Sequence, residues 1–184
     1  LVTGASGYIG SRLVSSLKRS GNEVTALIRR PLKSGTAWES NPDHLVTGDL
    51  RDAQVIEQLA ELQINAVVHT VSLLPKSTQN LRIEDVFAIN VIPTWNLLER
   101  LSKGPLGFFL YLSTQQVYGP LSSGPIDEGY PANPQHAYGL THLLSEEITR
   151  FFAKTSKVQC TNLRLSNCVG YPVFPDSHCW SLVA

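Results

Sequence analysis

Hydrophobic residues along this chain follow two alternating spacings. Runs of adjacent apolar and β-branched residues occupy positions 23–28, 44–47, 66–70, 106–113 and 158–165. Between these runs, apolar residues recur every three or four positions at 10–20, 52–62, 86–101 and 135–153. The runs predict buried strands, and the wider spacing predicts amphipathic helices. Their alternation predicts an α/β fold with a doubly wound, mostly parallel sheet covered on both faces.

Capping and helix-breaking residues mark the ends of several predicted helices. Gly21 suits the left-handed cap of the first helix, and Asp52 suits the N-cap of the second. Pro93 predicts a kink or break near Ile92, and Pro134 fits the first turn of the long helix. The sequence shows no internal repeat beyond this alternation and no linker that would divide the chain into domains.

Length and composition favour one domain with a real core. Fifteen Lys and Arg residues balance fifteen Asp and Glu residues, which gives no reason to expect nucleic acid or an acidic membrane surface as a partner. No apolar run approaches the roughly 20 residues that span a bilayer, and no signal-peptide pattern opens the chain. Cys160, Cys168 and Cys179 lack CxxC spacing, which favours reduced thiols and a cytoplasmic protein.

Both ends of the sequence predict a longer protein. The chain contains no methionine and starts just ahead of a glycine-rich turn, although strands usually run about five or six residues. At the other end, residues 180–184 look like the first turn of another element. We therefore expect further sequence on both sides.

The opening stretch combines the end of a strand, a glycine-rich turn and the start of a helix. It reads Leu1-Val2-Thr3-Gly4-Ala5-Ser6-Gly7-Tyr8-Ile9-Gly10. Three glycines at this spacing allow a tight turn, close approach of a pyrophosphate and packing of the helix on its strand. The helix N-terminus offers free N–H groups and a positive dipole end to phosphates. A plain strand-to-helix turn is the alternative, but the flanking apolar pattern favours a dinucleotide site.

The end of the second predicted strand indicates which dinucleotide is bound. An acidic residue there accepts from the ribose 2′-OH of NAD, whereas arginine accommodates the 2′-phosphate of NADP. Ile28 fills the acidic position, and Arg29 and Arg30 follow it. A guanidinium can hold phosphate through two parallel hydrogen bonds. The sequence therefore favours NADP, with NAD as the alternative if these arginines are merely a solvated strand end.

Three polar residues are candidates for chemistry near this cofactor. Thr114 follows a predicted strand, at the sheet edge where open α/β folds bind ligands. Tyr138 and His142 lie four residues apart on the long predicted helix, so they share one face. A tyrosine hydroxyl can act as acid or base toward a carbinol or carbonyl, with a neighbouring hydroxyl holding the substrate oxygen. A packed, structural tyrosine is the alternative.

In these motifs the chain resembles the extended short-chain dehydrogenases/reductases, in the NAD(P)-dependent epimerase/dehydratase family. The resemblance implies a Rossmann-type sheet, with most of the substrate-binding domain C-terminal to this chain and its start near residue 166. The matching stretches follow the family's order along nearly the whole chain. They are Thr3 to Gly10, Gly48-Asp49-Leu50-Arg51-Asp52, Asn90-Val91 with Asn96-Leu97-Leu98-Glu99, Leu112 to Gly119, Asn133-Pro134 ahead of Tyr138-Gly139, and Arg164-Leu165-Ser166-Asn167.

The resemblance implies a role for each matching position. Thr114 corresponds to the residue that bonds the substrate hydroxyl, Tyr138 to the catalytic acid–base, and His142 to the third catalytic member. The implied cofactor contacts are Gly4, Ser6, Gly7, Tyr8, Ile9 and Gly10 in the loop, Asp49 and Leu50 near adenine, Val71, and Asn90 in the supporting hydrogen-bond chain. Gln115, Gln116 and Asn167 are the implied substrate contacts.

Two departures from the family pattern change the expected chemistry. His142 stands where the family has a lysine that bonds the nicotinamide ribose and lowers the tyrosine pKa. With an ordinary pKa near 6.5, imidazole is mostly neutral at pH 7, so an attraction of about 4 kcal/mol between charges 4 Å apart is lost. Gln115-Gln116 replaces the acidic pair of the dehydratase branch, which disfavours 4,6-dehydration. Epimerisation or ketone reduction remains.

The leading hypothesis is an NADP-preferring epimerase or ketoreductase that acts on a nucleotide sugar or a similar sugar. The alternative is a cofactor-binding regulator or scaffold without turnover, which His142 favours. A third alternative is that this stretch alone is not the functional protein. The resemblance also implies a homodimer formed through the two long helices. No histidine spacing is typical of a metal site.

Overall fold

The computed structural model describes residues 1–32, 38–73, 82–120 and 124–168. The strands are β1 (Val2–Thr3), β2 (Thr25–Ile28), β3 (His44–Thr47), β4 (Ala66–His69), β5 (Phe108–Thr114) and β6 (Gln159–Leu165). The helices are α1 (Tyr8–Arg19), α2 (Ala53–Glu61), α3 (Ile83–Asn90), α4 (Ile92–Leu101) and α5 (Ala137–Thr155), with a 3₁₀ turn, η2, at Gln115–Tyr118. The predicted alternation of strands and helices is confirmed.

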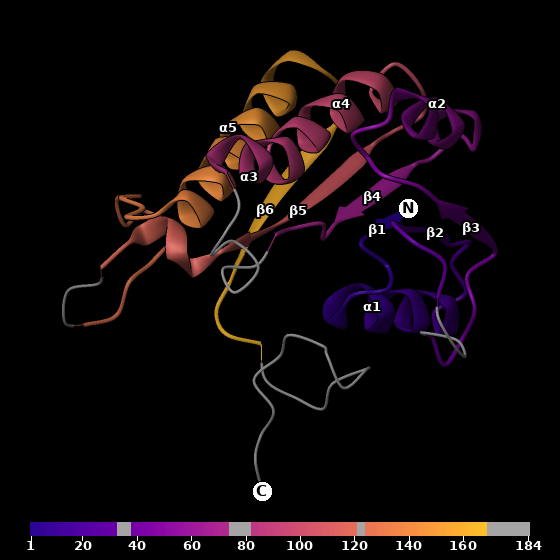
Figure 1. The fold of residues 1–184 in the computed structure, drawn as a ribbon, viewed down its shortest axis with the longest axis horizontal. Coiled ribbons are helices and arrows are strands. Elements are labelled where there is room, and N and C mark those ends of the chain that lie inside the picture. The colour runs from indigo at the N-terminus through magenta and orange to yellow at the C-terminus, as the bar shows by residue number, and fades with distance from the viewer. Residues whose placement is uncertain (33–37, 74–81, 121–123, 169–184) are drawn as a thin grey trace, which may run out of the picture.

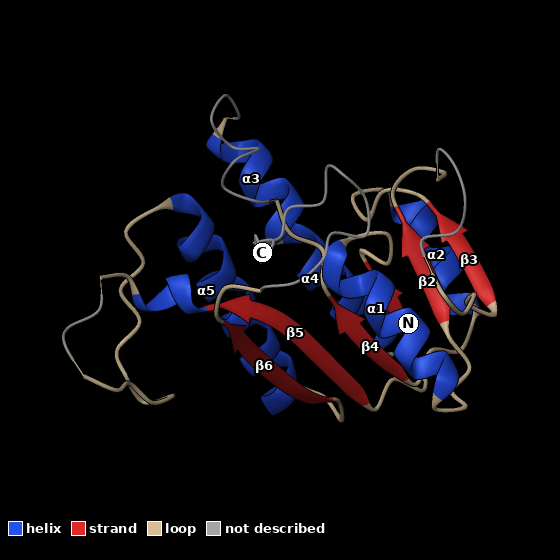
Figure 2. Ribbon diagram, turned by 90° about the horizontal axis from the view of Figure 1, so that it is seen from below, coloured by secondary structure: helices blue, strands red, loops and turns tan. Residues whose placement is uncertain are grey.

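All six strands form one parallel sheet in the order β3-β2-β1-β4-β5-β6. Helix α1 lies on one face, and α2, α3, α4 and α5 lie on the other (Figure 1). Viewed from below, α1 lies in front of the sheet between β4 and β2, while β5 and β6 are seen without a described helix in front of them (Figure 2). The doubly wound, Rossmann-type sheet expected from the sequence is therefore present.

Because the strands are parallel, their carboxyl ends lie along one edge of the sheet. Thr3, His69 and Thr114 end β1, β4 and β5 at this edge. The strand order changes direction between β1 and β4, since β2 follows β1 on one side and β4 pairs with it on the other. Open α/β sheets bind their ligands at such a switch point.

Two apolar clusters fill the layers on either side of the sheet. The larger one joins the sheet to α2, α4 and α5 and includes the fully buried Leu59, Leu97 and Phe109. The smaller one lies under α1 and includes Val14 and Trp38. Trp38 also donates its indole N–H to the carbonyl of Ala5 (2.9 Å), which ties the residue to the glycine-rich turn.

Most predicted helix boundaries are confirmed. Gly21 follows α1 with φ +79°, and Asp52 caps α2 by accepting the N–H of Gln54 (2.9 Å). The helical pattern across Pro93 breaks at Val91, which separates α3 from α4.

The expected start of the long helix is wrong by two residues. Helix α5 begins at Ala137, so Pro134 lies ahead of its first turn. The reason is a cap: His136 accepts the N–H of Gly139 on its Nδ1 (3.2 Å). His136 is the N-cap and has an extended conformation, so the helix begins at the next residue.

The described residues contain no helix that is long and apolar enough to cross a membrane. Cys160 and Cys168 are free thiols. Cys179, residues 180–184 and most of the expected start of a substrate-binding domain lie outside the described residues.

Candidate active site

The glycine-rich turn brings the N-terminus of α1 to the carboxyl edge of the sheet. Gly4 has φ +64°, and a Cβ there would lie 2.7 Å from the hydroxyl of Thr70. A Cβ on Gly10 would lie 2.3 Å from the carbonyl oxygen of Gly4. Gly7 caps α1 without any side-chain hydrogen bond to the helix. The turn and the first turn of α1 therefore pack too closely to admit side chains at Gly4 and Gly10. The free N–H groups of the first turn and the positive end of the helix dipole suit a diphosphate.

The residues expected to select the cofactor lie at the ends of β2 and β3. Ile28 is buried, whereas Arg29 and Arg30 are exposed. Asp49 accepts hydrogen bonds from Arg51 on both carboxylate oxygens, Nε to Oδ1 at 2.9 Å and Nη2 to Oδ2 at 2.7 Å. The Arg51 guanidinium holds the pKa of Asp49 below its usual value, and the charge of Arg29 acts in the same direction.

Thr114 and Tyr138 lie together where β5 ends and α5 begins. The hydroxyl of Thr114 accepts the N–H of Gln116 (3.3 Å) and lies near the Tyr138 phenol. Gly139 permits this approach, because a Cβ there would lie 2.6 Å from the carbonyl oxygen of Gln116. Burial raises the pKa of Tyr138, while hydrogen bonds with Ser72 and Thr114 act to lower it. The structure therefore brings the predicted pair together.

The His142 ring packs against the Tyr138 ring, with ring centroids 4.5 Å apart and planes tilted by 58°. Its side chain is buried, and both ring nitrogens are engaged: Nε2 with the hydroxyl of Ser72 and Nδ1 with the hydroxyl of Tyr111, each at 2.9 Å. Burial lowers the pKa of His142 to about 4, so the ring is neutral at pH 7. The sequence-based expectation of a neutral imidazole agrees with this environment.

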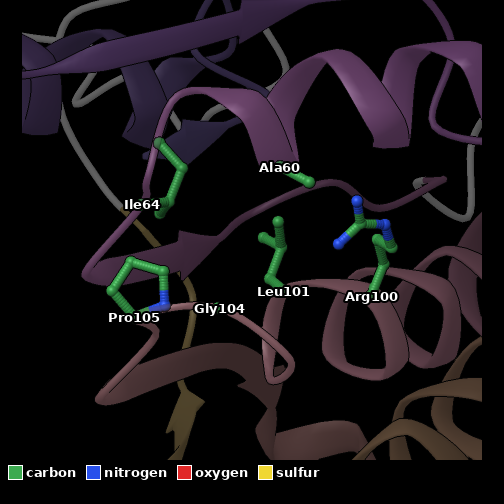
Figure 3. Close-up of a pocket in the computed structure, with 6 residues that line it drawn as sticks. All are labelled: Ala60, Ile64, Arg100, Leu101, Gly104 and Pro105. Carbon is green, nitrogen blue, oxygen red and sulfur yellow. The ribbon is translucent and has the colours of Figure 1, made fainter.

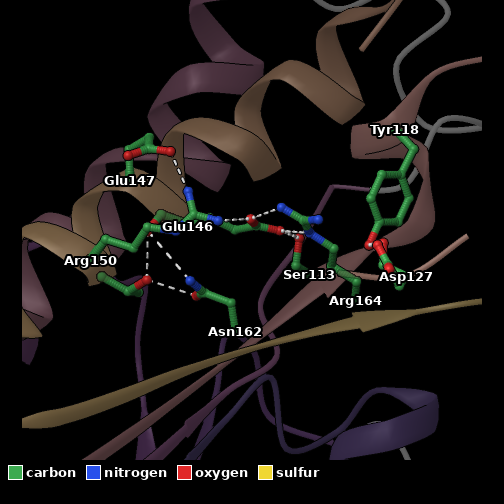
Figure 4. Close-up of polar contacts among 9 residues, drawn as sticks. Ser113, Tyr118, Asp127, Glu146, Glu147, Arg150, Asn162 and Arg164 are labelled. Carbon is green, nitrogen blue, oxygen red and sulfur yellow. Dashed lines mark hydrogen bonds and ion pairs between the residues drawn. The ribbon is translucent and has the colours of Figure 1, made fainter. Parts of the chain in front are cut away.

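A buried carboxylate lies one turn further along α5. Glu146 accepts hydrogen bonds from Ser113 (2.6 Å) and from Arg164 (2.9 and 2.7 Å), as Figure 4 shows. Arg150 adds a contact to Oε2 at 2.8 Å. Burial acts to raise the pKa of Glu146, but the hydrogen bonds from Arg164 and Ser113 outweigh it and lower the pKa. This charged cluster ties α5 to β5 and β6.

Asn90 connects the helices behind the site. Its side-chain oxygen accepts the N–H of Leu73 (2.8 Å), and its side-chain NH₂ donates to Thr141 (3.0 Å). The residue is fully buried, which agrees with a supporting position in a hydrogen-bond chain.

The other expected contacts lie at the same edge with different degrees of exposure. Leu50 is buried in the larger apolar cluster, and Val71 is half-buried against that cluster. In the loop, Ser6, Tyr8 and Ile9 are half-buried, with the guanidinium of Arg12 over the Tyr8 ring at 4.0 Å. Gln115 and Gln116 are half-buried in η2, and Asn167 is exposed beyond β6.

Three residues of this site were not singled out from the sequence: Ser72, Tyr111 and Glu146. Glu146 carried a usable signal, because it follows His142 by four residues and so shares its helix face. Ser72 follows β4 and Tyr111 lies within β5, and no spacing in the sequence connects them to His142.

The pocket drawn in Figure 3 belongs to another part of the fold. Its lining residues are Ala60, Ile64, Arg100, Leu101, Gly104 and Pro105. Ile64 precedes β4 and Pro105 precedes β5, so the pocket lies at the amino ends of the strands, away from the glycine turn. Within the described ranges, no three His, Cys, Asp or Glu side chains gather as a group that could hold a metal ion.

Comparison with known proteins identifies the family of this chain. The model of the NAD dependent epimerase/dehydratase family matches residues 1–183. The chain belongs to this family. The resemblance stated from the motifs is thereby confirmed, as is the α/β dinucleotide-binding fold that it implies.

Epimerases are prominent among the family members that this chain resembles. A putative UDP-glucose 4-epimerase of Methanocaldococcus jannaschii is 30% identical over 174 residues, which cover 92% of this chain and 56% of that protein. The UDP-glucose 4-epimerase of Thermotoga maritima, solved with UDP-glucose, has a TM-score of 0.82 at 26% identity, covering 93% of this chain and 56% of that one. MoeE5, solved with UDP-glucuronic acid and NAD, has a TM-score of 0.80 at 29% identity, covering 95% and 56%. The chain spans about half the length of these relatives.

Proposed function

We propose that this protein is an NAD(P)-dependent epimerase or ketoreductase of nucleotide sugars. The observation that carries the proposal is the position of Tyr138, at the start of α5, beside Thr114 at the carboxyl end of β5. That pair lies on the same sheet edge as the glycine turn, where the N-terminus of α1 offers its free N–H groups to a diphosphate. Family members related to this chain act on UDP-sugars, which supports a nucleotide sugar as substrate.

In the proposed reaction, Thr114 and Tyr138 hold the substrate oxygen and move its proton. The Thr114 hydroxyl bonds the sugar hydroxyl, and Tyr138 takes the proton from that hydroxyl or returns it. A bound nicotinamide dinucleotide supplies the hydride acceptor and donor. Gln115 and Gln116 carry neutral amides and cannot serve as an acid–base pair, so the proposal favours epimerisation or reduction over 4,6-dehydration.

The proposed cofactor is NADP, with NAD as the alternative. Two exposed arginines, Arg29 and Arg30, follow the buried Ile28 at the position where this fold meets the ribose. Related structures contain NAD, which supports a nicotinamide dinucleotide of either kind.

A second candidate is a regulator or scaffold that binds the dinucleotide without turnover. It is favoured by His142, which is neutral and has both ring nitrogens engaged within the protein. Such a residue supplies no permanent charge beside Tyr138.

Turnover separates these two candidates. The protein at its full natural length is incubated with NADP⁺ or NAD⁺ and UDP-glucose, and both UDP-galactose formation and absorbance at 340 nm are followed. The enzyme hypothesis predicts turnover that falls by about 10²-fold or more in Tyr138→Phe and in Thr114→Val. Dinucleotide binding without sugar conversion, across a panel of UDP- and dTDP-sugars, would support the regulator instead.

A further inference from the structure

Two hydroxyl groups from different elements hold the imidazole of His142. The Tyr111 hydroxyl, from β5, lies 2.9 Å from Nδ1, and the Ser72 hydroxyl, just after β4, lies 2.9 Å from Nε2. A neutral imidazole donates from one nitrogen and accepts on the other, and a hydroxyl can do either, so both bonds form in either tautomer. Both hydrogen-bonding positions of the ring are therefore used within the protein.

Tyr111 gives this arrangement a fixed inner end. It is buried in the middle of β5, paired with His69 of β4 on one side and with Asn162 of β6 on the other. Its ring also contacts the rings of His69 and His142, with centroids 5.8 Å and 5.6 Å apart. A side chain enclosed in this way has little room for another rotamer, because protein interiors are close-packed. The hydroxyl that holds His142 is thus itself held in place.

Tyr138 packs on the ring that these hydroxyls hold. It precedes His142 by four residues on α5, so the two side chains are neighbours on one helix face. Their rings are in contact, with centroids 4.5 Å apart and planes tilted by 58°. His142 is buried whereas Tyr138 is half-buried, so the histidine forms the inner wall against which the phenol rests.

We propose that His142 is a positioning residue that holds the Tyr138 phenol in its reactive orientation and makes no contact with the dinucleotide. Tyr111 and Ser72 act through His142, as the anchors of its ring. The proposal rests on the proposed function and deepens it. It gives His142 a role different from that of the lysine that the family resemblance implies at this position, which bonds the nicotinamide ribose.

The physical reason is the precision that proton transfer needs. Tyr138 must place its oxygen within about 3 Å of the substrate hydroxyl. A displacement of about 1 Å can lower the rate by about 10²-fold. His142 adds no charge to the site at pH 7, because burial lowers its pKa to about 4, so its contribution is the position of its ring. Losing an anchor of that ring should therefore lower kcat and leave dinucleotide binding unchanged.

Turnover and dinucleotide binding, measured on the same variants at full natural length, test this role. His142→Phe keeps an aromatic ring but loses both hydrogen bonds, and Tyr111→Phe removes one anchor. We expect kcat for the nucleotide sugar to fall by about 10²-fold in His142→Phe and by about ten-fold in Tyr111→Phe. The Kd of NADP⁺ and of NAD⁺ should change less than about two-fold in both variants.

Two results would overturn the proposal and leave the proposed function standing. A Kd that rises more than about ten-fold in His142→Phe would show that His142 binds the cofactor. Wild-type kcat in His142→Phe would show that the orientation of Tyr138 does not depend on the histidine.

Control variants separate positioning from general loosening of α5. Thr149→Val removes a buried hydroxyl of the same helix, bonded to Asn162 at 2.7 Å and two turns beyond His142, and its kcat should equal that of the wild type. A loss in Thr149→Val as large as that in Tyr111→Phe would overturn the proposal. Ser72→Thr keeps the hydroxyl and should restore most of the kcat that Ser72→Ala loses.

Crystal structures of the ligand-free wild type and of His142→Ala test the role without turnover. We expect one orientation of the Tyr138 ring in the wild type and more than one in His142→Ala. A single, unchanged orientation in His142→Ala would overturn the positioning role. Failure of the wild type to convert any nucleotide sugar would overturn the proposed function, and these two structures would then decide by themselves whether His142 positions Tyr138.

Discussion

Arg164 of β6 holds both carboxylate oxygens of the fully buried Glu146, at 2.9 Å from Nε and 2.7 Å from Nη2. Tyr118 covers the other side of the guanidinium, with the ring centroid 4.6 Å from its central carbon. The ion pair of Arg164 with Glu146 fixes the face of α5 that also carries Tyr138 and His142. The position of the site therefore depends on an ion pair that lies one helical turn below it.

Removing Arg164 should destabilise the protein strongly. Arg164→Leu leaves the Glu146 carboxylate buried without its main partner, and we expect the free energy of unfolding to fall by about 3–5 kcal/mol. Denaturant unfolding measures this change. Arg150→Leu is the control, because Arg150 is partly exposed and its loss should cost about 1 kcal/mol or less. Equal losses in the two variants would contradict the assignment of Arg164 as the principal partner.

Acid should destabilise the fold through two buried histidines. Burial lowers the pKa of His69 from 6.5 to about 3 and that of His142 from 6.5 to about 4. Below pH 6.5 the unfolded chain binds protons at both positions that the folded chain does not, so stability is lost as the pH falls toward 4. At about 1.4 kcal/mol per pH unit, each histidine contributes roughly 3 kcal/mol across this window.

Unfolding measured at pH 6.5 and pH 4 checks this linkage. His69→Leu should lose less stability between the two pH values than the wild type, by up to about 3 kcal/mol. His44→Gln, at an exposed position on β3, should behave as the wild type does. An unchanged pH dependence in His69→Leu would show that His69 is not held neutral by burial.

Dinucleotide binding should depend on Gly10, in the first turn of α1, more than on Gly21, which follows the end of that helix. A methyl group on Gly10 would lie 2.3 Å from the Gly4 carbonyl oxygen, so Gly10→Ala must displace the helix from the turn. We expect its Kd for the dinucleotide to rise more than about ten-fold, equivalent to 1.4 kcal/mol. Gly21→Ala is the control: its φ of +79° makes it somewhat destabilising, but a Cβ there meets open space and lies far along the helix. Titration calorimetry that finds both variants equally weakened would contradict a phosphate site at the turn.

Arg29 should select NADP over NAD. Arg29→Ala is expected to weaken NADP⁺ by roughly 10- to 100-fold, as the loss of a charged hydrogen bond of about 1.5–3 kcal/mol implies, and to leave NAD⁺ unchanged. Arg19→Ala, which removes another exposed guanidinium at the far end of α1, should change neither. Binding titrations of both nucleotides measure the ratio, and tighter binding of NAD⁺ by the wild type would overturn the NADP assignment.

The proposed homodimer should involve the exposed aromatic pair of α4 and α5. Trp95 and Phe151 stack with ring centroids 5.8 Å apart and remain 39% and 49% exposed. Phe151→Asp places a charge in that face, and light scattering should show the mass of a dimer reduced to that of a monomer. Leu45→Asp, at an exposed position on β3, should leave the mass unchanged. A monomeric wild type would contradict the proposal.

The sequence by itself determined the order of the elements and the position of the glycine-rich turn. Gly4, Gly7 and Gly10 mark a backbone that must turn and pack closely, and this requirement is local, so spacing alone reveals it. The break before Pro93 and the cap at Asp52 were readable for the same reason. The start of α5 was misplaced because a histidine cap, His136, carries no strong sequence signal.

Only the tertiary structure decided how His142 is used. Its partners Ser72 and Tyr111 lie 70 and 31 residues away along the chain. Parallel pairing of β4 with β5, and the packing of α5 on that face, bring these side chains together. Hydrogen-bond direction and desolvation depend on such long-range neighbours, and a one-dimensional pattern contains neither. The sequence therefore identifies the histidine at position 142, and the fold determines its hydrogen-bond partners and its burial.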